Sequence, residues 1–118
     1  MSFQNDIPLI QKIFDFYKDL CFVVEKMPKK DKFTLGERLQ NLTLDCAGLF
    51  IEAGYKDKYQ RAAVLEKAAI KLDLLKILTR LAQESKAIST RQYLSLEEKL
   101  QEIGRMLGGW LKSAKASG

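Results

Sequence analysis

The chain contains no histidine, which removes the side chain that most often serves as a general base or as a zinc ligand. Its two cysteines, Cys21 and Cys46, both fall at apolar positions of helical patterns. We therefore expect buried free thiols in a reducing compartment, rather than a disulfide or a metal pair. No apolar run approaches the roughly 18 residues of a membrane-spanning helix, and the N-terminus lacks the basic-then-apolar order of a signal peptide. These absences predict a cytoplasmic protein with no membrane association.

Motifs of catalysis are also missing. The chain has no phosphate-binding glycine loop, no GxSxG nucleophile motif and no cluster of side chains at metal-ligand spacing. The carboxylates Glu97, Glu98 and Glu102 are typical of a solvated helix face. We therefore predict that the protein is not an enzyme and that it has no cofactor, no metal site and no small-molecule substrate.

Helical periodicity is what the sequence has in abundance. In 118 residues, of which 47% are hydrophobic and 30% charged, both prolines fall within the first 28 positions. The length and composition are those of one globular domain over residues 1–118. Alternating β-branched runs are absent, and apolar residues recur every three or four positions in four stretches joined by short connections. This pattern predicts an all-α, antiparallel up-down-up-down four-helix bundle.

The first two helices are predicted at about residues 6–27 and 34–53. Asn5 or Asp6 caps the first, and Pro8 falls in its first turn. Thr34 and Glu37 have the spacing of a capping box at the start of the second, and Gly54 has the position of a left-handed residue just past its end. The predicted buried stripe of the first helix consists of Ile10, Ile13, Phe14, Tyr17, Leu20, Cys21, Val24 and Met27. That of the second consists of Leu35, Leu39, Leu42, Cys46, Leu49 and Ala53.

The third helix, predicted at about residues 58–86, has two apolar faces. One stripe, suited to the bundle core, consists of Leu65, Ala68, Leu72, Leu75 and Ala82. A second stripe, on nearly the opposite side, consists of Ile70, Leu74, Ile77 and Leu81. A contiguous apolar stripe outside a bundle is typical of a contact with another surface, so we predict a subunit interface in an oligomer. The alternative is a broad core face with scattered exposed leucines.

The net charge of +5 favours acidic partners such as nucleic acid. Lys67 and Lys71 flank the second stripe on one side, and Lys76 and Arg80 lie beyond its other edge. Each pair is four residues apart and therefore adjacent on the helix surface. The alternative to a functional role is an ordinary solvated charge pattern.

The fourth helix is predicted to begin after Ser89, with Gln92 completing a capping box. Its predicted seam consists of Tyr93, Leu96, Leu100, Ile103, Leu107 and Trp110 or Leu111. Three glycines accompany the only tryptophan, although each costs roughly 0.5–1 kcal/mol relative to alanine inside a helix. Gly104 and Gly108 expose bare backbone on one shoulder of the seam, so we predict close packing against Trp110 or a neighbouring helix. Gly109 projects elsewhere and is not explained by that face.

Two segments carry a family resemblance: FTLGERLQNLTLD at 33–45 and AISTRQYLSLEEKLQEIGRMLGGWLKS at 87–113. With the long basic helix between them, they resemble the accessory variability determinant (Avd) proteins of diversity-generating retroelements. The resemblance covers nearly the whole chain from about Pro28 onward, and GRMLGGW is its most specific part. The wider superfamily of small four-helix-bundle proteins includes those encoded within intervening sequences of bacterial ribosomal RNA genes, and its members have a similar glycine-bearing fourth helix.

The resemblance to Avd proteins implies a non-enzymatic homopentameric barrel with a basic surface and a central pore. It implies two kinds of partner, the retroelement's reverse transcriptase and RNA or DNA, in the mutagenic copying of a template repeat into a variable gene. It does not assign the contacts. Our candidates for nucleic-acid or partner binding are Lys67, Lys71, Lys76, Arg80 and Arg105. The alternative function is a helical adaptor of the ribosomal RNA intervening-sequence family with no direct nucleic-acid role.

Overall fold

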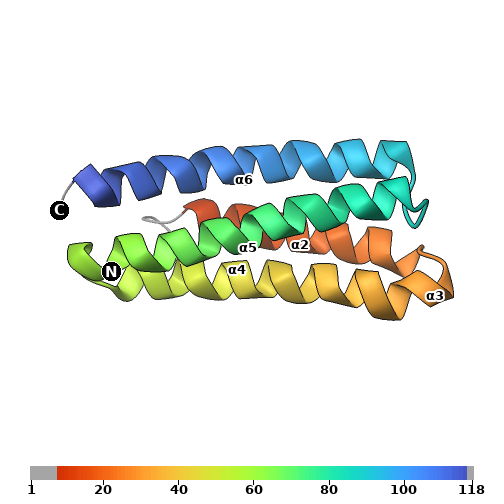
Figure 1. The fold of residues 1–118 in the computed structure, drawn as a ribbon, viewed down its shortest axis with the longest axis horizontal. Helices are drawn as coiled ribbons and strands as arrows, with labels where there is room; N and C mark the ends of the chain where they lie inside the picture. The colour runs from red at the N-terminus through yellow and green to blue at the C-terminus, as the bar shows by residue number, and fades with distance from the viewer. Residues whose placement is uncertain (1–7, 117–118) are drawn as a thin grey trace.

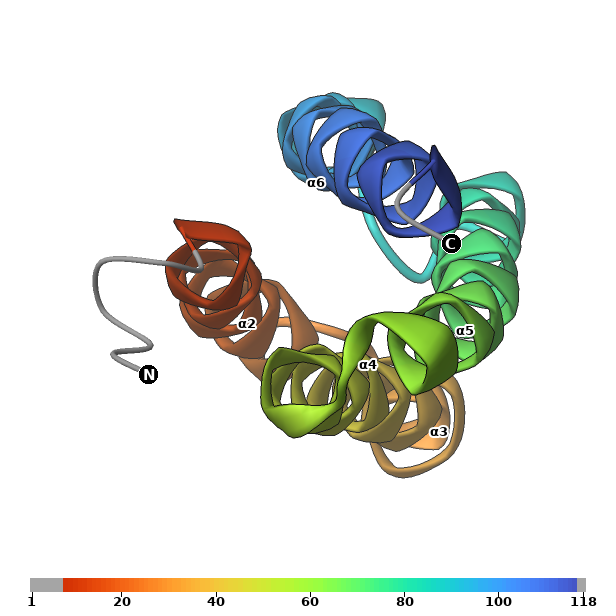
Figure 2. The ribbon, with the colours of Figure 1, turned by 90° about the vertical axis from the view of Figure 1, so that its left-hand side faces the viewer.

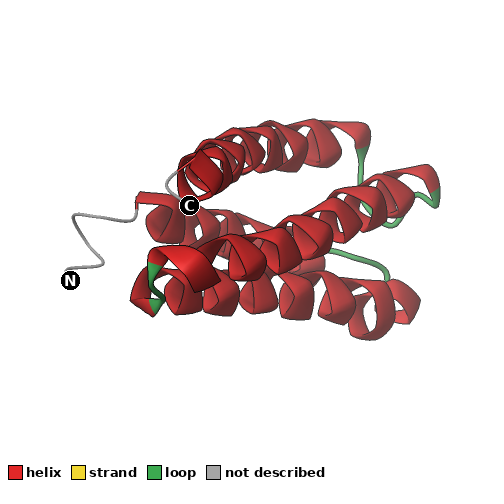
Figure 3. Cartoon of the chain, turned by 60° about the vertical axis from the view of Figure 1, so that its left-hand side comes forward, coloured by secondary structure: helices red, strands yellow, loops and turns green. Residues whose placement is uncertain are grey.

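The computed structural model describes residues 8–116, which form helices and connections without any strand (Figure 3). The four long helices are α2 (Pro8–Glu25), α4 (Glu37–Tyr55), α5 (Lys58–Glu84) and α6 (Thr90–Ala116). A single turn of helix, α3 (Lys29–Asp31), and a π-helical turn, η1 (Lys32–Gly36), lead into α4. Successive long helices run in opposite directions (Figure 1), which confirms the predicted up-down-up-down bundle.

Each long helix packs mainly against two neighbours. Helix α4 lies between α2 and α5, and α6 lies between α5 and α2 (Figure 2). The core fills the space that they enclose. All five residues of the predicted core stripe in α5 are buried, and so are the central residues of the α4 and α6 seams. The arrangement places α2 diagonally across from α5, so the outward faces of these two helices look in different directions.

The predicted buried stripe of α2 is partly wrong. Leu9 and Phe16, which were not predicted to be buried, lie in the core, whereas Phe14 is 37% exposed. Ile10, Tyr17 and Cys21 are half-buried. The reason is that α2 contacts α6 as well as α4, which turns its buried face away from the predicted stripe. The predicted caps of this helix, Asn5 and Asp6, lie outside the described residues.

The predicted capping box at the start of α4 is also wrong. Helical structure begins at Lys29, directly after Pro28, and Thr34 lies inside it. The Thr34 hydroxyl donates to the carbonyl oxygens of Lys30, at 2.9 Å, and Asp31, at 3.3 Å, instead of accepting from an amide. Such a side-chain bond competes for helix carbonyls. The Glu37 N–H bonds to the Lys32 carbonyl five residues earlier, which is the pattern of a π-helix.

The prediction that Gly54 ends α4 is wrong. Gly54 lies within the helix, and no described glycine has a positive φ. The helix end is held instead by Arg61, whose Nε donates to the Ala53 carbonyl at 2.9 Å and whose guanidinium also donates to the Lys56 carbonyl at 2.8 Å. A side chain of the next helix therefore satisfies carbonyls that a helix C-terminus leaves without partners.

The connection from α5 to α6 combines one predicted cap with one unforeseen turn. Ser89 and Gln92 form the predicted capping box, with reciprocal hydrogen bonds of 2.8 and 3.0 Å. Before it, Lys86 adopts a left-handed conformation with φ of 67°. The Ala87 N–H bonds to the Ala82 carbonyl at 2.8 Å, and the Lys86 N–H bonds to the Gln83 carbonyl at 3.1 Å. These bonds form a Schellman motif in which lysine takes the position that usually holds glycine.

Candidate functional site

The outward face of α5 is apolar, as the second stripe of the sequence indicates. Ile70 is 70% exposed, Ile77 is 63% exposed and Leu81 is 46% exposed. Leu74 is half-buried and packs against the core at its inner side. Water-facing isoleucines in a row along one helix are an apolar surface without a partner inside the chain, and such surfaces mark contact sites.

Other apolar side chains are exposed that sequence analysis did not single out. Phe22 on α2 is 67% exposed, Phe33 in η1 is 62% exposed and Leu94 on α6 is 56% exposed. The Lys32 ammonium lies 5.8 Å from the centre of the Phe33 ring, within the range of a cation–π contact. In the sequence, these residues lack the three-and-four periodicity that drew attention to α5. Their exposure follows from how the helices are rotated in the bundle, which a single sequence does not specify.

The structure does not bring the five predicted cationic contacts together. Lys71 Nζ lies 3.5 Å from Asp45 Oδ2 of α4, on one flank of α5. Lys76 leans toward α6 on the other flank, and Arg80 Nε lies 3.2 Å from Glu84 Oε1 on the same helix. Lys67 and Arg105 are exposed on α5 and α6, respectively. Two of the five cations therefore have carboxylate partners already, and the set is divided between different sides of the bundle.

The glycines of α6 differ from one another in their surroundings. A Cβ added at Gly104 would stand 2.8 Å from the Lys76 Nζ, so a side chain of the neighbouring helix does come close there. A Cβ at Gly108 or Gly109 would have no atom of the described chain within 4 Å. The close packing predicted at Gly108 is therefore wrong within a single chain. Trp110 is half-buried, and its ring faces the guanidinium of Arg61, 5.9 Å away, rather than the glycines.

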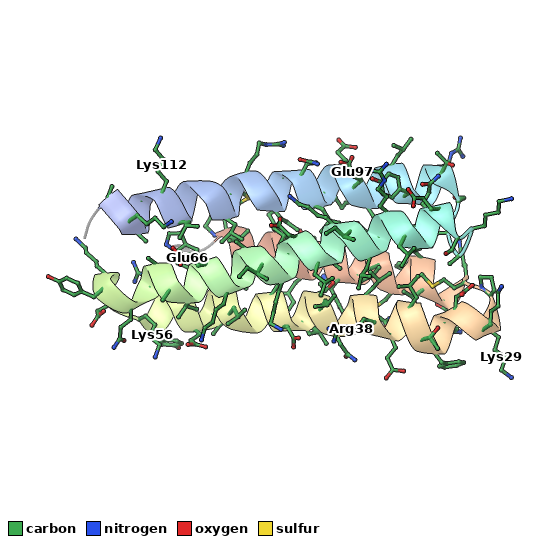
Figure 4. The ribbon with its side chains drawn as sticks, viewed as in Figure 1. Lys29, Arg38, Lys56, Glu66, Glu97 and Lys112 are labelled. Carbon is green, nitrogen blue, oxygen red and sulfur yellow. The ribbon has the colours of Figure 1, made fainter. Side chains whose placement is uncertain are left out.

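A cluster of cations that sequence analysis did not select lies at one end of the bundle, which we call the basic end. It consists of Lys26, Lys29, Lys30, Lys32, Lys86 and Arg91. The four lysines up to Lys32 come from the segment between α2 and α4, Lys86 from the connection between α5 and α6, and Arg91 from the first turn of α6. These segments lie at the same end of the bundle (Figure 1), where Lys29 is labelled in Figure 4. Lys26 and Lys86 line one open cavity of about 530 Å³ between the two connections. The run KKDK at residues 29–32 gives no local signal of this cluster, because its proximity to Lys86 depends on the fold.

Both cysteines are free thiols, and neither is fully exposed to solvent. Burial, the largest cause, raises the pKa of Cys46 to about 12, and the nearby Asp45 carboxylate acts in the same direction. Cys21 is half-buried, and its sulfur accepts a hydrogen bond from Gln40 Nε2 at 3.5 Å. The Cys21 side chain also raises the pKa of Tyr17 through a hydrogen bond. Residues 8–116 contain no group of three or more Cys, Asp or Glu side chains placed to hold a metal ion.

None of the described helices combines the length and the apolar character that crossing a membrane requires. A comparison with curated proteins finds no match to the chain. A family model described as bAvd-like, in contrast, matches residues 8–114, which include all four long helices nearly to the end of α6. The matched region contains the GRMLGGW segment and the basic helix on which the resemblance to Avd proteins is based. This chain therefore belongs to the bAvd-like family.

Proposed function

We propose that the protein is a non-catalytic accessory factor of a diversity-generating retroelement, which assembles as a homo-oligomer and binds the reverse transcriptase and nucleic acid. The observation that supports this proposal most directly is the bAvd-like family match over residues 8–114. The positive net charge of +5 agrees with a polyanionic partner. The exposed stripe on α5 agrees with assembly.

Assembly is the part of the proposal that the geometry supports best. The apolar stripe of Ile70, Leu74, Ile77 and Leu81 would be covered by a second copy, and a pentamer would have a mass near five times 13.5 kDa. Light scattering on the wild type tests this directly. Ile77→Asp places a charge in the stripe and should lower the mass of the assembly. Leu94→Asp, a matched change at an exposed leucine of α6, should leave it unchanged.

A wild-type mass of 13.5 kDa at micromolar concentration would contradict assembly. Equal effects of Ile77→Asp and Leu94→Asp would contradict the assignment of the interface to α5. Circular dichroism of both variants controls for loss of helix, since neither side chain contributes to the core.

Nucleic-acid binding separates the proposal from its alternative. A labelled RNA of mixed sequence should bind to the wild type with an affinity that falls linearly with salt concentration on logarithmic axes, because phosphate contacts release counterions. Pull-down with the retroelement reverse transcriptase tests the second partner. Retention of the transcriptase without RNA binding at low salt would favour a helical adaptor. The pairing of Lys71 with Asp45 and of Arg80 with Glu84 is the observation that keeps this alternative open.

A further inference from the structure

Positive charge is concentrated at the basic end of the bundle. Residues 25–32 hold four lysines and two carboxylates, and residues 84–91 hold two cations and one carboxylate. These sixteen residues therefore carry a net charge of +3, compared with +5 for the whole chain. The two segments are far apart in the sequence, and the fold brings them to the same end (Figure 1).

Ion pairs in the described part of the chain involve five cations, all of them on the sides of the bundle. Lys12 pairs with Glu102 and Lys115 with Glu66, both at 3.0 Å, whereas other cations on the sides, such as Lys67 and Arg105, form no ion pair within residues 8–116. None of the ion pairs in the described part of the chain involves a cation of the basic end. The carboxylate of Glu84, which lies beside the cavity, bonds to Arg80 instead. The basic end is therefore a surface of net positive charge, none of whose cations forms an ion pair in the described part of the chain.

The backbone at Lys86 adds a second observation. A left-handed conformation is unfavourable for any residue with a Cβ, and glycine is the usual residue at this position of a Schellman motif. The chain nevertheless has lysine there, with φ of 67° and an exposed side chain that lines the cavity with Lys26. Backbone strain of this kind is concentrated at functional positions. This chain therefore has a cation at a position where glycine would fit the turn better.

The chemistry of the basic end fits phosphates rather than a protein surface. Met27, Ala87 and Ile88 are buried in the two connections, whereas Phe33, next to Lys32, is 62% exposed. The Lys32 ammonium lies 5.8 Å from the centre of the Phe33 ring, so this apolar side chain is presented together with a cation. Lysine, which supplies five of the six cations of the basic end, is depleted in the centres of protein interfaces. Hydroxyl groups are also exposed beside the cations, on Ser89 and Thr90. Lysine, arginine, serine and threonine are the side chains that contact nucleic-acid phosphates.

We propose that the basic end is the main surface of this protein for the phosphate backbone of a nucleic acid. The proposal rests on the nucleic-acid binding proposed above and locates it, moving the principal contacts from the sides of α5 to the end of the bundle. Lys29, Lys30 and Lys86 supply exposed charges from both connections. The cavity between the connections admits a phosphate between Lys26 and Lys86.

Two triple variants with the same change in charge test the location. The first, Lys29→Gln, Lys30→Gln and Lys86→Gln, neutralises the basic end. The second, Lys71→Gln, Lys76→Gln and Arg80→Gln, neutralises the sides of α5. Each lowers the net charge from +5 to +2. Binding of a fluorescently labelled single-stranded RNA is titrated against salt for wild type and both variants, with circular dichroism and light scattering to verify fold and assembly.

The basic-end variant should show a flatter salt dependence than the wild type. Each phosphate contact contributes about 0.7 to the logarithmic slope for a single strand. Three lost contacts would reduce the loss of affinity between about 50 and 200 mM salt by about 20-fold. The α5 variant should keep the slope of the wild type.

Equal flattening in both variants would overturn the proposal, because net charge and not location would then control binding. Flattening in the α5 variant alone would overturn it in favour of the residues selected from the sequence. Competition by polyglutamate as strong as that by unlabelled RNA, at equal charge concentration, would point to an acidic protein partner and would also overturn it. Absence of RNA binding by the wild type would remove the proposed nucleic-acid function itself, a result distinct from the other three.

Discussion

Alanine at two helical glycines should change the stability of this protein in opposite directions. Gly36 has an ordinary helical backbone, with φ of −59° and ψ of −47°, and Gly108 lies within α6. At Gly108, an added Cβ would have no atom within 4 Å, so the substitution changes only the helix propensity. Gly108→Ala should therefore raise the free energy of unfolding by about 0.5–1 kcal/mol.

The same methyl group at Gly36 would meet the core. It would stand 2.7 Å from Val24 Cγ1 and 3.1 Å from Met27 Sδ, and both of these side chains are buried. Valine is β-branched and restricted at χ1, so the end of α2 would have to move away from η1. Overpacking of this kind costs about 1–3 kcal/mol, which exceeds the propensity gain of at most about 1 kcal/mol. Gly36→Ala should lower the free energy of unfolding by up to about 2 kcal/mol.

Urea denaturation followed by far-ultraviolet circular dichroism measures both effects, at one protein concentration because assembly shifts apparent stability. For a domain of this size, 1 kcal/mol corresponds to a change in Tm of about 3–6 °C, so thermal melts provide a second readout. A Gly36→Ala midpoint at or above that of the wild type would refute the reasoning from close approach. A urea midpoint of Gly108→Ala below that of the wild type would refute the inference that the surroundings of Gly108 are open, and would indicate that another copy of the chain contacts this glycine.

Three further predictions concern single side chains. Arg61→Ala should lower the free energy of unfolding, measured by urea denaturation, by about 1.5–3 kcal/mol, because two carbonyls lose a charged donor. Arg61→Lys should be no more stable than Arg61→Ala, because lysine lacks the planar fork that reaches both carbonyls. Lys86→Gly should raise the free energy of unfolding by about 1 kcal/mol, because glycine relieves the left-handed conformation, and should weaken RNA binding in the salt titration. Burial raises the pKa of Cys46 to about 12 in the fold, from an ordinary value of 9.0, so this thiol should resist alkylation by iodoacetamide up to pH 9, as counted by mass spectrometry. Above that pH the unfolded thiol loses its proton while the folded thiol keeps it, so this residue's contribution to stability should fall as pH rises from 9 to 12, and Cys46→Ala should flatten the decline in urea midpoints.

The helices themselves could be predicted because their signals are local and repeated. The seams of α4, α5 and α6 recur every three or four residues over many turns, and the capping box of Ser89 and Gln92 spans only four neighbouring positions. In α2 the apolar residues surround more of the helix, so periodicity alone could not tell which of Phe14 and Phe16 faces the core. Contacts with α6, a helix far along the chain, decided it.

The errors at helix ends have a common physical cause. A threonine three residues before a glutamate resembles a cap, but the Thr34 hydroxyl had helix carbonyls within reach once the chain turned at Pro28. A glycine near a helix end resembles a terminator, but Arg61 of the next helix satisfied the carbonyls of α4. In each case a group outside the local pattern supplied or accepted the hydrogen bond.

The two candidate surfaces also differ in whether a local sequence pattern could predict them. The exposed stripe on α5 follows from the two-faced periodicity of one helix, so the sequence predicted its place. The basic end depends on two connections that only the folded chain brings together, and no window of sequence contains both Lys29 and Lys86. Ion pairs such as that between Lys71 and Asp45 also depend on the rotation of neighbouring helices.

The guanidinium of Arg61 has a consequence for the way the bundle opens. It bonds to the last carbonyls of α4, belongs to the first turn of α5, and covers the Trp110 ring near the end of α6. Loosening of α4 at this end and fraying of α6 therefore break contacts of the same group. We therefore expect amide protons at these two helix ends, remote from each other in the sequence, to exchange as one cooperative unit of local unfolding that a single side chain links.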